Sequence, residues 1–284
     1  MRAFHSTWTG PFLKSQKGDF YVEDFELLTT VLSALKWQEL NGDIKMITDP
    51  IGAAYYRDLG LEHLWNLGIE ERLTDIDPHL NPKVFWAAGK IYALAEEEAP
   101  CVMMDTDFIV WNKVEEELRK HSIAVIHKEE LQPNVYPAKE SLHMASDYEA
   151  FSRWNWEVRP CNTAFMYIGD EDFKQFYVNE SKAFMRAAQG DDPLIYMVFA
   201  EQRLLAMCAE EKQIELFACA EVGELFNEHQ QCFTHIWGHK RYLRNHPERR
   251  IAFCKRCMKR IKKDYPDFYP VLQQIEVLKV YDES

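Results

Sequence analysis

Two aspartates follow an apolar segment a little over a third of the way along the chain. Residues 101–104 read Cys-Val-Met-Met, and Asp105-Thr106-Asp107 comes directly after them. We expect the apolar residues to form a strand, which leaves both carboxylates at the carboxyl edge of a sheet, where open α/β folds bind ligands. Mg²⁺ and Mn²⁺ prefer carboxylate oxygens and are commonly shared with substrate phosphates. Acids beside so apolar a run cost free energy unless something compensates them, and a metal ion would.

A second group of chemically able residues lies far along the chain. His235, Gly238, Lys240 and Arg241 fall within seven residues. Histidine binds Mn²⁺ beside carboxylates, glycine lets the backbone approach a phosphate, and Lys or Arg neutralises phosphate charge. Taken alone this segment says little. Together with a distant pair of aspartates it describes a metal-bridged diphosphate that is held from both sides.

Three further polar positions could contribute to such a site. Asn162 enters an apolar strand from a turn of small residues, and Glu201-Gln202 precede an apolar helical run. A carboxylate and amides near a sugar could hold hydroxyls or steady an oxocarbenium-like centre. Asp49 also ends a strand, so it could contact a ribose or cap a helix, and both readings stay open. The Asn162 segment and the Glu201-Gln202 segment, considered singly, are each more often structural.

The elements that must position these residues alternate along the chain. Hydrophobic spacing predicts strands over 4–8, 44–49, 102–104, 122–127 and 163–168 and helices over 24–40, 53–59, 84–97, 171–189 and 193–211. Residues 70–82 read as a loop, and 129–156 as an excursion with one short helix. Alternating strands and helices predict an α/β sheet with a largely parallel core. We expect a single domain over 1–284, with a core over 1–241 and a basic helical extension over 242–284.

Composition and charge restrict the class of partner. The chain has 284 residues and a net charge of −13, yet residues 240–263 hold 11 of its 33 Lys and Arg and only one acid, Glu248. So acidic a body argues against nucleic acid as a partner. The basic segment 240–263 has two readings. It could contact a membrane surface near a lipid-linked acceptor, or it could pack as a cap helix on the acidic body, which we favour.

The sequence also restricts the compartment. No apolar stretch approaches the roughly 18–20 residues that span a bilayer, and the first residues lack the apolar core of a signal peptide. Seven scattered cysteines do not resemble a disulfide framework, and Cys254 and Cys257 lack the partners of a zinc site. We therefore expect a cytoplasmic protein, with peripheral attachment to the inner face of the membrane as the variant that segment 240–263 suggests.

Taken in chain order, the chemically able residues resemble a known family. Asp105-Thr106-Asp107, Asn162-Thr163-Ala164, Glu201-Gln202 and His235-x-x-Gly238 are similar to motifs of the retaining nucleotide-sugar glycosyltransferases with the GT-A fold. Glycosyltransferase family eight and its bacterial surface-polysaccharide relatives match best. The resemblance implies an α/β fold with a mixed, mostly parallel sheet flanked by helices. It also implies a part in surface polysaccharide synthesis.

The resemblance assigns roles to these residues. It implies that Asp105, Asp107 and His235 hold Mn²⁺ or Mg²⁺ on the diphosphate of a nucleotide-diphospho-sugar, with a UDP-sugar as the first expectation. On the acceptor side it implies Glu201, Gln202 and Asn162, near the point where a hydroxyl of a glycan or lipid-linked acceptor attacks. The expected donor contacts come from Thr7, Asp49, Lys90, Thr106, Gly238, Lys240 and Arg241.

The chain departs from the family pattern at three points. Arg241 stands where the family has its final Lys, with Lys240 one residue earlier, so either cation could meet the phosphate. The family's following Pro-Trp is replaced by Tyr242-Leu243, and His5-Ser6-Thr7-Trp8 replaces its usual nucleotide-binding opening. These departures leave the identity of the base open.

We therefore expect a metal-dependent glycosyltransferase, and two other classes remain. A phosphohydrolase of the haloacid dehalogenase type also ends a strand in D-x-D, but Phe108-Ile109 follow Asp107 here and the motif lies far from the start of the chain. A domain that binds nucleotide or glycan without turnover is the other alternative. Donor sugar, acceptor and linkage are not encoded in any pattern of this sequence.

Overall fold

A seven-stranded sheet forms the centre of the protein, which is described by a computed structural model over residues 1–146, 148–225 and 231–282. The strands follow the order β3-β2-β1-β4-β7-β6-β8. All neighbouring pairs are parallel except those that β7 makes with β4 and β6. The strands are β1 (Ala3–Thr7), β2 (Ile44–Thr48), β3 (Ile69–Glu71), β4 (Cys101–Met104), β6 (Ile123–Lys128), β7 (Cys161–Ile168) and β8 (Leu216–Ala218).

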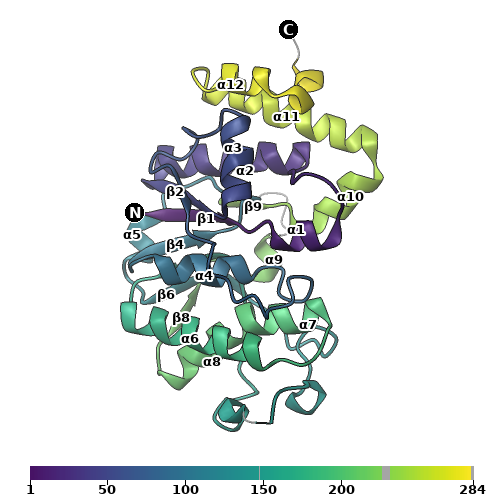
Figure 1. Ribbon diagram of the computed structural model, residues 1–284. Coiled ribbons are helices and arrows are strands. Elements are labelled where there is room, and N and C mark those ends of the chain that lie inside the picture. The colour runs from purple at the N-terminus through teal and green to yellow at the C-terminus, as the bar shows by residue number, and fades with distance from the viewer. Residues whose placement is uncertain (147, 226–230, 283–284) are drawn as a thin grey trace.

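Helices cover both faces of this sheet (Figure 1). Successive strand residues point to opposite faces, so Val102 and Met104 belong to one hydrophobic cluster and Cys101 and Met103 to the other. The first cluster includes residues of α2, α11 and α12, and the second includes residues of α4, α6 and α8. The helices are α1 (Gly10–Ser15), α2 (Asp24–Leu40), α3 (Pro50–Asp58), α4 (Ala88–Glu96), α5 (Glu115–Leu118), α6 (Glu171–Ala187), α7 (Pro193–Val198), α8 (Leu204–Glu211), α9 (Val222–Leu225), α10 (Lys240–Asn245), α11 (Pro247–Asp264) and α12 (Tyr269–Gln274).

Local sequence explains where several elements begin. The Asp49 side chain accepts from Gly52 N at the start of α3, and Pro50 supplies a fixed φ at its first position. Asp170 caps α6 in the same way by accepting from Phe173 N. Such a cap is worth about 1 kcal/mol to a helix. Gly42, at φ +120°, lets the chain turn from α2 into β2 beside Met1.

The predicted α/β class and its mostly parallel sheet are confirmed, and the predicted helix over 24–40 matches α2. The predicted helices over 171–189 and 193–211 correspond to α6 and to a run of α7, a π-helical turn (Phe199–Arg203) and α8. The expectation of a loop over 70–82 was wrong at its start, because Ile69–Glu71 form the edge strand β3 beside β2. Three residues are too few to show a period.

A separate two-stranded ribbon was not predicted. Strand β5 (Phe108–Val110) follows the two aspartates and pairs antiparallel with β9 (Phe233–His235). Each strand has three residues, so neither carries a hydrophobic pattern long enough to recognise. The ribbon joins two segments of the chain that are far apart in sequence, and it adjoins the candidate site.

The basic C-terminal segment packs on the body of the protein as a cap. The apolar face of α11 is buried against the first cluster through Cys254, Cys257, Met258 and Ile261. Arg250 donates to Asp24 at 2.7 Å, which ties α11 to the start of α2. The membrane reading of residues 240–263 loses its basis here, because the face that would enter a lipid surface is already covered. Residues 283–284 of the predicted extension lie outside the described part of the chain.

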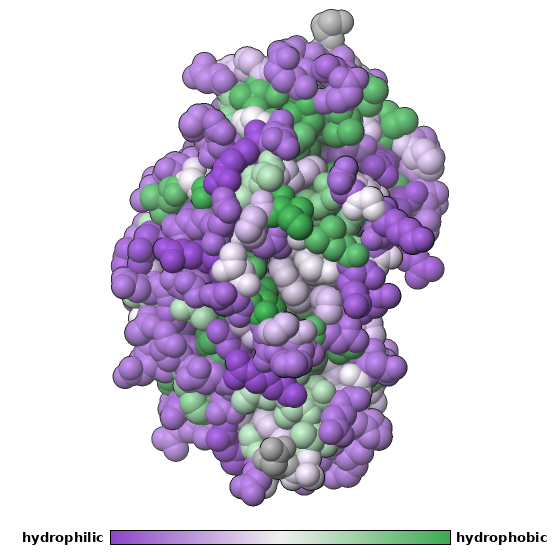
Figure 2. All heavy atoms as spheres, viewed as in Figure 1, coloured by the Kyte–Doolittle hydropathy of each residue, from purple (hydrophilic) through white to green (hydrophobic). Residues whose placement is uncertain are grey.

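The surface is mainly hydrophilic on the face shown in Figure 2, where apolar residues gather in a few patches. Within the described residues, no helix is long and apolar enough to cross a membrane. The thiols of Cys254 and Cys257 are unpaired and buried, and burial raises the pKa of Cys257 to about 12.

Candidate functional site

The D-x-D segment forms a tight turn between β4 and β5. Phe108 N donates to Asp105 O at 3.0 Å, which closes the turn, and Asp105 N donates to Ala164 O of β7 at 2.7 Å. Ile236 N donates to Asp107 O at 3.4 Å from the far side. The turn is therefore held by its own backbone, by β7 and by the residue after β9. Both carboxylates lie at the end of a central strand, as the apolar run predicts.

His235 reaches this turn through the β5–β9 ribbon. It is the register partner of Phe108, the residue directly after Asp107. One ligand atom from each of Asp105, Asp107 and His235 lies within 4.8 Å of the other two. The pairing thus brings His235 to two aspartates that lie more than a hundred residues earlier in the sequence.

The donor atoms of this trio suit a divalent cation. Burial would raise the pKa of Asp107, but Lys240 and His235 outweigh it and hold that pKa below its ordinary value. Burial lowers the pKa of His235 despite the two aspartates, so at neutral pH the ring offers a lone pair. Asp107 Oδ2 is buried and makes no hydrogen bond within the described part of the chain; its neighbours are His235 Nε2 at 3.8 Å and Lys240 Nζ at 3.1 Å, an ion pair. Two carboxylates and an imidazole are ligands that Mn²⁺ accepts.

Lys90 connects the first aspartate to a buried glutamate. Its Nζ lies 2.7 Å from Asp105 Oδ1 and forms an ion pair with Glu201. Burial would lower the pKa of Lys90, but the two carboxylates outweigh it and raise that pKa. Glu201 also accepts from Thr163 Oγ1 at 2.6 Å, and its burial raises its pKa against the pull of Lys90. An ammonium group is thus fixed beside the candidate metal ligands.

Glu201 comes from the π-helical turn Phe199–Arg203 between α7 and α8. Such turns widen a helix locally and recur at functional sites. Two side chains of α6 satisfy the carbonyls of this turn: Tyr177 Oη donates to Glu201 O at 2.6 Å and Ser181 Oγ donates to Ala200 O at 2.8 Å. The irregular turn is therefore held by α6.

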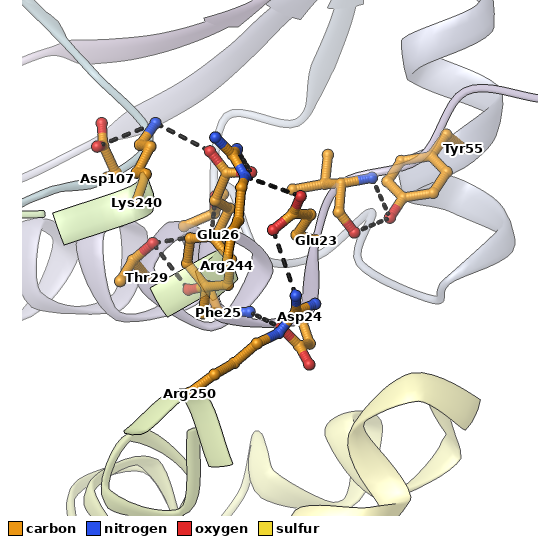
Figure 3. A network of polar contacts seen from close by, with 12 residues as sticks. Glu23, Asp24, Phe25, Glu26, Thr29, Tyr55, Asp107, Lys240, Arg244 and Arg250 are labelled. Atoms are coloured by element: carbon orange, nitrogen blue, oxygen red, sulfur yellow. Dashed lines mark hydrogen bonds and ion pairs between the residues drawn. The ribbon is translucent and has the colours of Figure 1, made fainter. Parts of the chain in front are cut away.

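Lys240 provides a second ammonium group on the other side of the turn. Its Nζ lies between Asp107 and Glu26, 2.9 Å from Glu26 Oε1 (Figure 3). The network continues from Glu26 through Arg244 to Glu23 and on through Arg250 to Asp24. It joins α10 and α11 to the start of α2, so the cap positions Lys240. Four carboxylates (Glu26, Asp105, Asp107 and Glu201) surround two ammonium groups, and this excess of negative charge favours a bound cation.

A cavity of about 300 Å³ opens directly onto this cluster. The polar end of the cavity is formed by Lys90, Asp105, Thr106, Asp107 and Lys240. Aromatic residues line much of the remainder, and two of them, Tyr21 and Trp86, are 51% and 50% exposed. Tyr21 packs edge-on against Phe12 with ring centroids 5.1 Å apart. The cavity therefore combines a charged end with rings that can cover a flat ligand.

The predicted donor contacts divide into those at this cavity and those away from it. Thr7, Lys90, Thr106 and Lys240 line the cavity. Asp49 does not, because its carboxylate accepts from Thr9 N, Thr9 Oγ1 and Gly52 N, so the helix-cap reading is the one these contacts support. Of the two cations left open by the sequence, Lys240 reaches Asp107, whereas Arg241 is exposed and outside the lining.

Gly238 and Asn162 lie at a second cavity, of about 650 Å³, which His235 also lines. Asn162 Nδ2 donates to Glu129 Oε1 at 3.3 Å there. Gln202 accepts from Tyr136 Oη at 2.8 Å and lines neither of the two cavities. His235 belongs to this lining and the two aspartates line the first cavity, so the trio lies between the two cavities.

Sequence reasoning missed several residues of the site. Glu26, Tyr56, Tyr21 and Trp86 line the first cavity but lie in or beside elements that the sequence explains as helix. Of these four residues, Trp86 alone could have been identified from the sequence, since a large aromatic residue at the start of a helix either packs or contacts a ligand. Glu26 could not, because acids are common in a first helical turn.

Comparison with known proteins gives a family without a described activity. The model of DUF6734, a family of unknown function, matches residues 1–275. The chain belongs to this family. No curated protein matches it significantly.

Solved structures with distant similarity include three glycosyltransferases. Mouse xyloside xylosyltransferase 1 in its apo form has 7% identity and a TM-score of 0.38, over 76% of this chain and 84% of the other. The PaToxG glycosyltransferase has 11% identity and a TM-score of 0.39, over 74% and 69%. Glycosyltransferase GlyE of Streptococcus pneumoniae TIGR4 has 10% identity and a TM-score of 0.32, over 70% of this chain and 44% of its own. At these scores the likeness carries no conclusion about activity.

The trio predicts a metal-dependent gain in stability. Mn²⁺ at a hundredfold excess over its Kd should stabilise the parent by about 2.7 kcal/mol, because a ligand of the native state shifts unfolding by mass action. Asp107→Ala removes one ligand and should lose most of this gain. Thermal unfolding with and without Mn²⁺ measures it, with Asp267→Ala, an exposed carboxylate elsewhere, as matched control. A gain that survives in Asp107→Ala would contradict the assignment.

Proposed function

We propose that this protein is a metal-dependent glycosyltransferase that moves a sugar from a nucleotide-diphospho-sugar to an acceptor hydroxyl. The observation that carries the proposal is the convergence of Asp105, Asp107 and His235, because the two aspartates line the first cavity together with Lys90 and Lys240. Hard-cation ligands next to fixed ammonium groups match a diphosphate, and nearby aromatic rings match a base. The whole chain would act as one domain, with residues 242–284 as its helical cap.

The reaction breaks the bond between the anomeric carbon and the diphosphate, the acceptor oxygen forms the new bond to that carbon, and the acceptor proton passes to an oxygen of the departing diphosphate. A bound Mn²⁺ or Mg²⁺ would supply Lewis-acid stabilisation of the departing nucleoside diphosphate. Lys90 and Lys240 add positive charge at the same end of the cavity, where preorganised groups act most strongly on developing charge. Both are held in place by carboxylates, so they need little rearrangement to act.

The buried carboxylate of Glu201 would help to position the reacting sugar. It is fixed by Lys90 and Thr163 on the β7 side of Asp105. The second cavity, lined by Asn162, Gly238 and His235, suits the acceptor. A retaining outcome, a UDP-linked donor and a role in surface polysaccharide synthesis follow from the resemblance to glycosyltransferase family eight and form part of the proposal.

Turnover of donor sugars tests the proposal. With Mn²⁺ and a panel of UDP-, GDP- and ADP-sugars, we expect the parent to release nucleoside diphosphate from at least one donor. Asp107→Ala should reduce this rate by about 10²-fold or more, since loss of one electrostatic stabiliser typically costs that much. Asp267→Ala should keep the parental rate. Release of phosphate from a simple phosphoester, with every sugar donor left intact, would instead support a phosphohydrolase.

The aromatic residues of the first cavity predict that the base of a nucleoside diphosphate contributes to its binding separately from the diphosphate. Trp86→Ala should weaken Mn²⁺-dependent binding of the preferred nucleoside diphosphate by about tenfold or more, since stacking on a base is worth about 1–3 kcal/mol. Binding of inorganic pyrophosphate, which has no base, should not change. Calorimetric titration measures both ligands, and Trp237→Ala, an exposed tryptophan at the other cavity, is the control. Equal losses for both ligands would contradict the stacking role.

A further inference from the structure

A chain of buried polar side chains lies directly beneath the D-x-D turn. Trp65 Nε1 is 3.2 Å from His5 Nδ1, His5 Nε2 is 3.0 Å from Ser33 Oγ, and Ser33 Oγ is 2.5 Å from Phe108 O. The four residues come from the loop before β3, from β1, from α2 and from β5. All of them are at most 1% exposed. Burying these polar side chains costs free energy unless each is hydrogen-bonded, so the connected arrangement calls for a reason.

The direction of every hydrogen bond in this chain follows from its first member. An indole nitrogen can only donate, so Trp65 donates and His5 Nδ1 accepts. The neutral His5 ring then carries its proton on Nε2 and donates to Ser33. The single hydroxyl proton of Ser33 is left for Phe108 O, a stronger acceptor than its other neighbour, the Met104 sulfur at 3.9 Å. Burial lowers the pKa of His5 to about 3 despite the nearby Asp107, so this ring is neutral at physiological pH.

The last acceptor in this series of hydrogen bonds is Phe108, the residue that links Asp107 to His235 in the candidate metal trio. Phe108 follows Asp107 directly and is the register partner of His235. Its N–H closes the D-x-D turn, and its carbonyl accepts from Ser33. A shift of Phe108 would therefore move a carboxylate ligand and the imidazole ligand together. Groups that orient metal ligands from behind typically matter about 10–100-fold for affinity.

We propose that Trp65, His5 and Ser33 form a directional hydrogen-bond relay that positions Asp107 and His235 for the metal through the carbonyl of Phe108. The three are positioning residues, since none of them belongs to the ligand trio or lines the first cavity. This inference rests on the proposed metal site. It adds that the ligand geometry is set by β1 and α2 as well as by the turn itself.

The test compares Mn²⁺ affinity in matched variants, measured by electron paramagnetic resonance titration without nucleotide. Ser33→Ala removes the last donor and should raise the Kd by about 10–100-fold. Thr29→Ala removes an equally buried hydroxyl one turn earlier on α2, which bonds only to carbonyls of its own helix, and should leave the Kd unchanged. Ser33→Thr keeps the hydroxyl and should restore affinity. A structural role alone would lower the melting temperature of Ser33→Ala and Thr29→Ala without separating their Kd values.

The outcomes separate this inference from the proposed function. If the parent binds Mn²⁺ and folded Ser33→Ala binds it equally well, the relay is overturned and the metal site stands. If the parent binds no Mn²⁺, both are overturned. Should Ser33→Ala fail to fold, Trp65→Phe removes the donor that fixes the His5 tautomer, and parental affinity in that variant would overturn the relay. Nitrogen-15 spectra of the parent should show His5 protonated on Nε2 from pH 5 to 8, and a proton on Nδ1 would also overturn it.

Discussion

The antiparallel pairing of β5 with β9 is the interaction on which the rest of the site depends. It sets Phe108 opposite His235 and so brings the histidine to Asp107, 128 residues earlier in the chain. Two strands of three residues are marginal as an isolated hairpin. They persist here because Phe108 and Phe233 pack on the first hydrophobic cluster and on Phe165 of β7. Hydrophobic burial under the ribbon thus supplies the rigidity that a cation site needs above it.

Charge balance explains the arrangement around that ribbon. A trio with two carboxylates would repel itself in a partly buried site without compensation. Lys90 supplies positive charge from α4 and Lys240 from α10, and each is held in turn by a further acid, Glu201 or Glu26. The network through Arg244 and Arg250 extends this order to the C-terminal cap (Figure 3). The basic segment, for which the sequence allowed a membrane contact but favoured a cap helix, therefore stabilises the position of Lys240.

Many of the helices and strands could be predicted because their sequences show hydrophobic periodicity, and the trio could be predicted because its residues lie in motifs. The helix Asp24–Leu40 and the strand that ends at Asp105 follow from hydrophobic spacing, and the trio follows from the order of motifs along the chain. The short strands β3, β5, β8 and β9 were missed, since three residues show no period. Asp49 was ambiguous because a helix cap and a ribose contact use the same carboxylate. Trp65, His5 and Ser33 could not be linked, because only the folded chain brings residues 5, 33 and 65 together.

The central claim is that Asp105, Asp107 and His235 hold one metal ion. Electron spin-echo envelope modulation of bound Mn²⁺ tests it most directly, because this method detects the nitrogen of a coordinated imidazole. The account predicts coupling to one histidine nitrogen in the parent. The coupling should disappear in His235→Gln and persist in His127→Gln, which changes a histidine at the second cavity. Bound Mn²⁺ without nitrogen coupling in the parent, or coupling that survives in His235→Gln, would contradict the account.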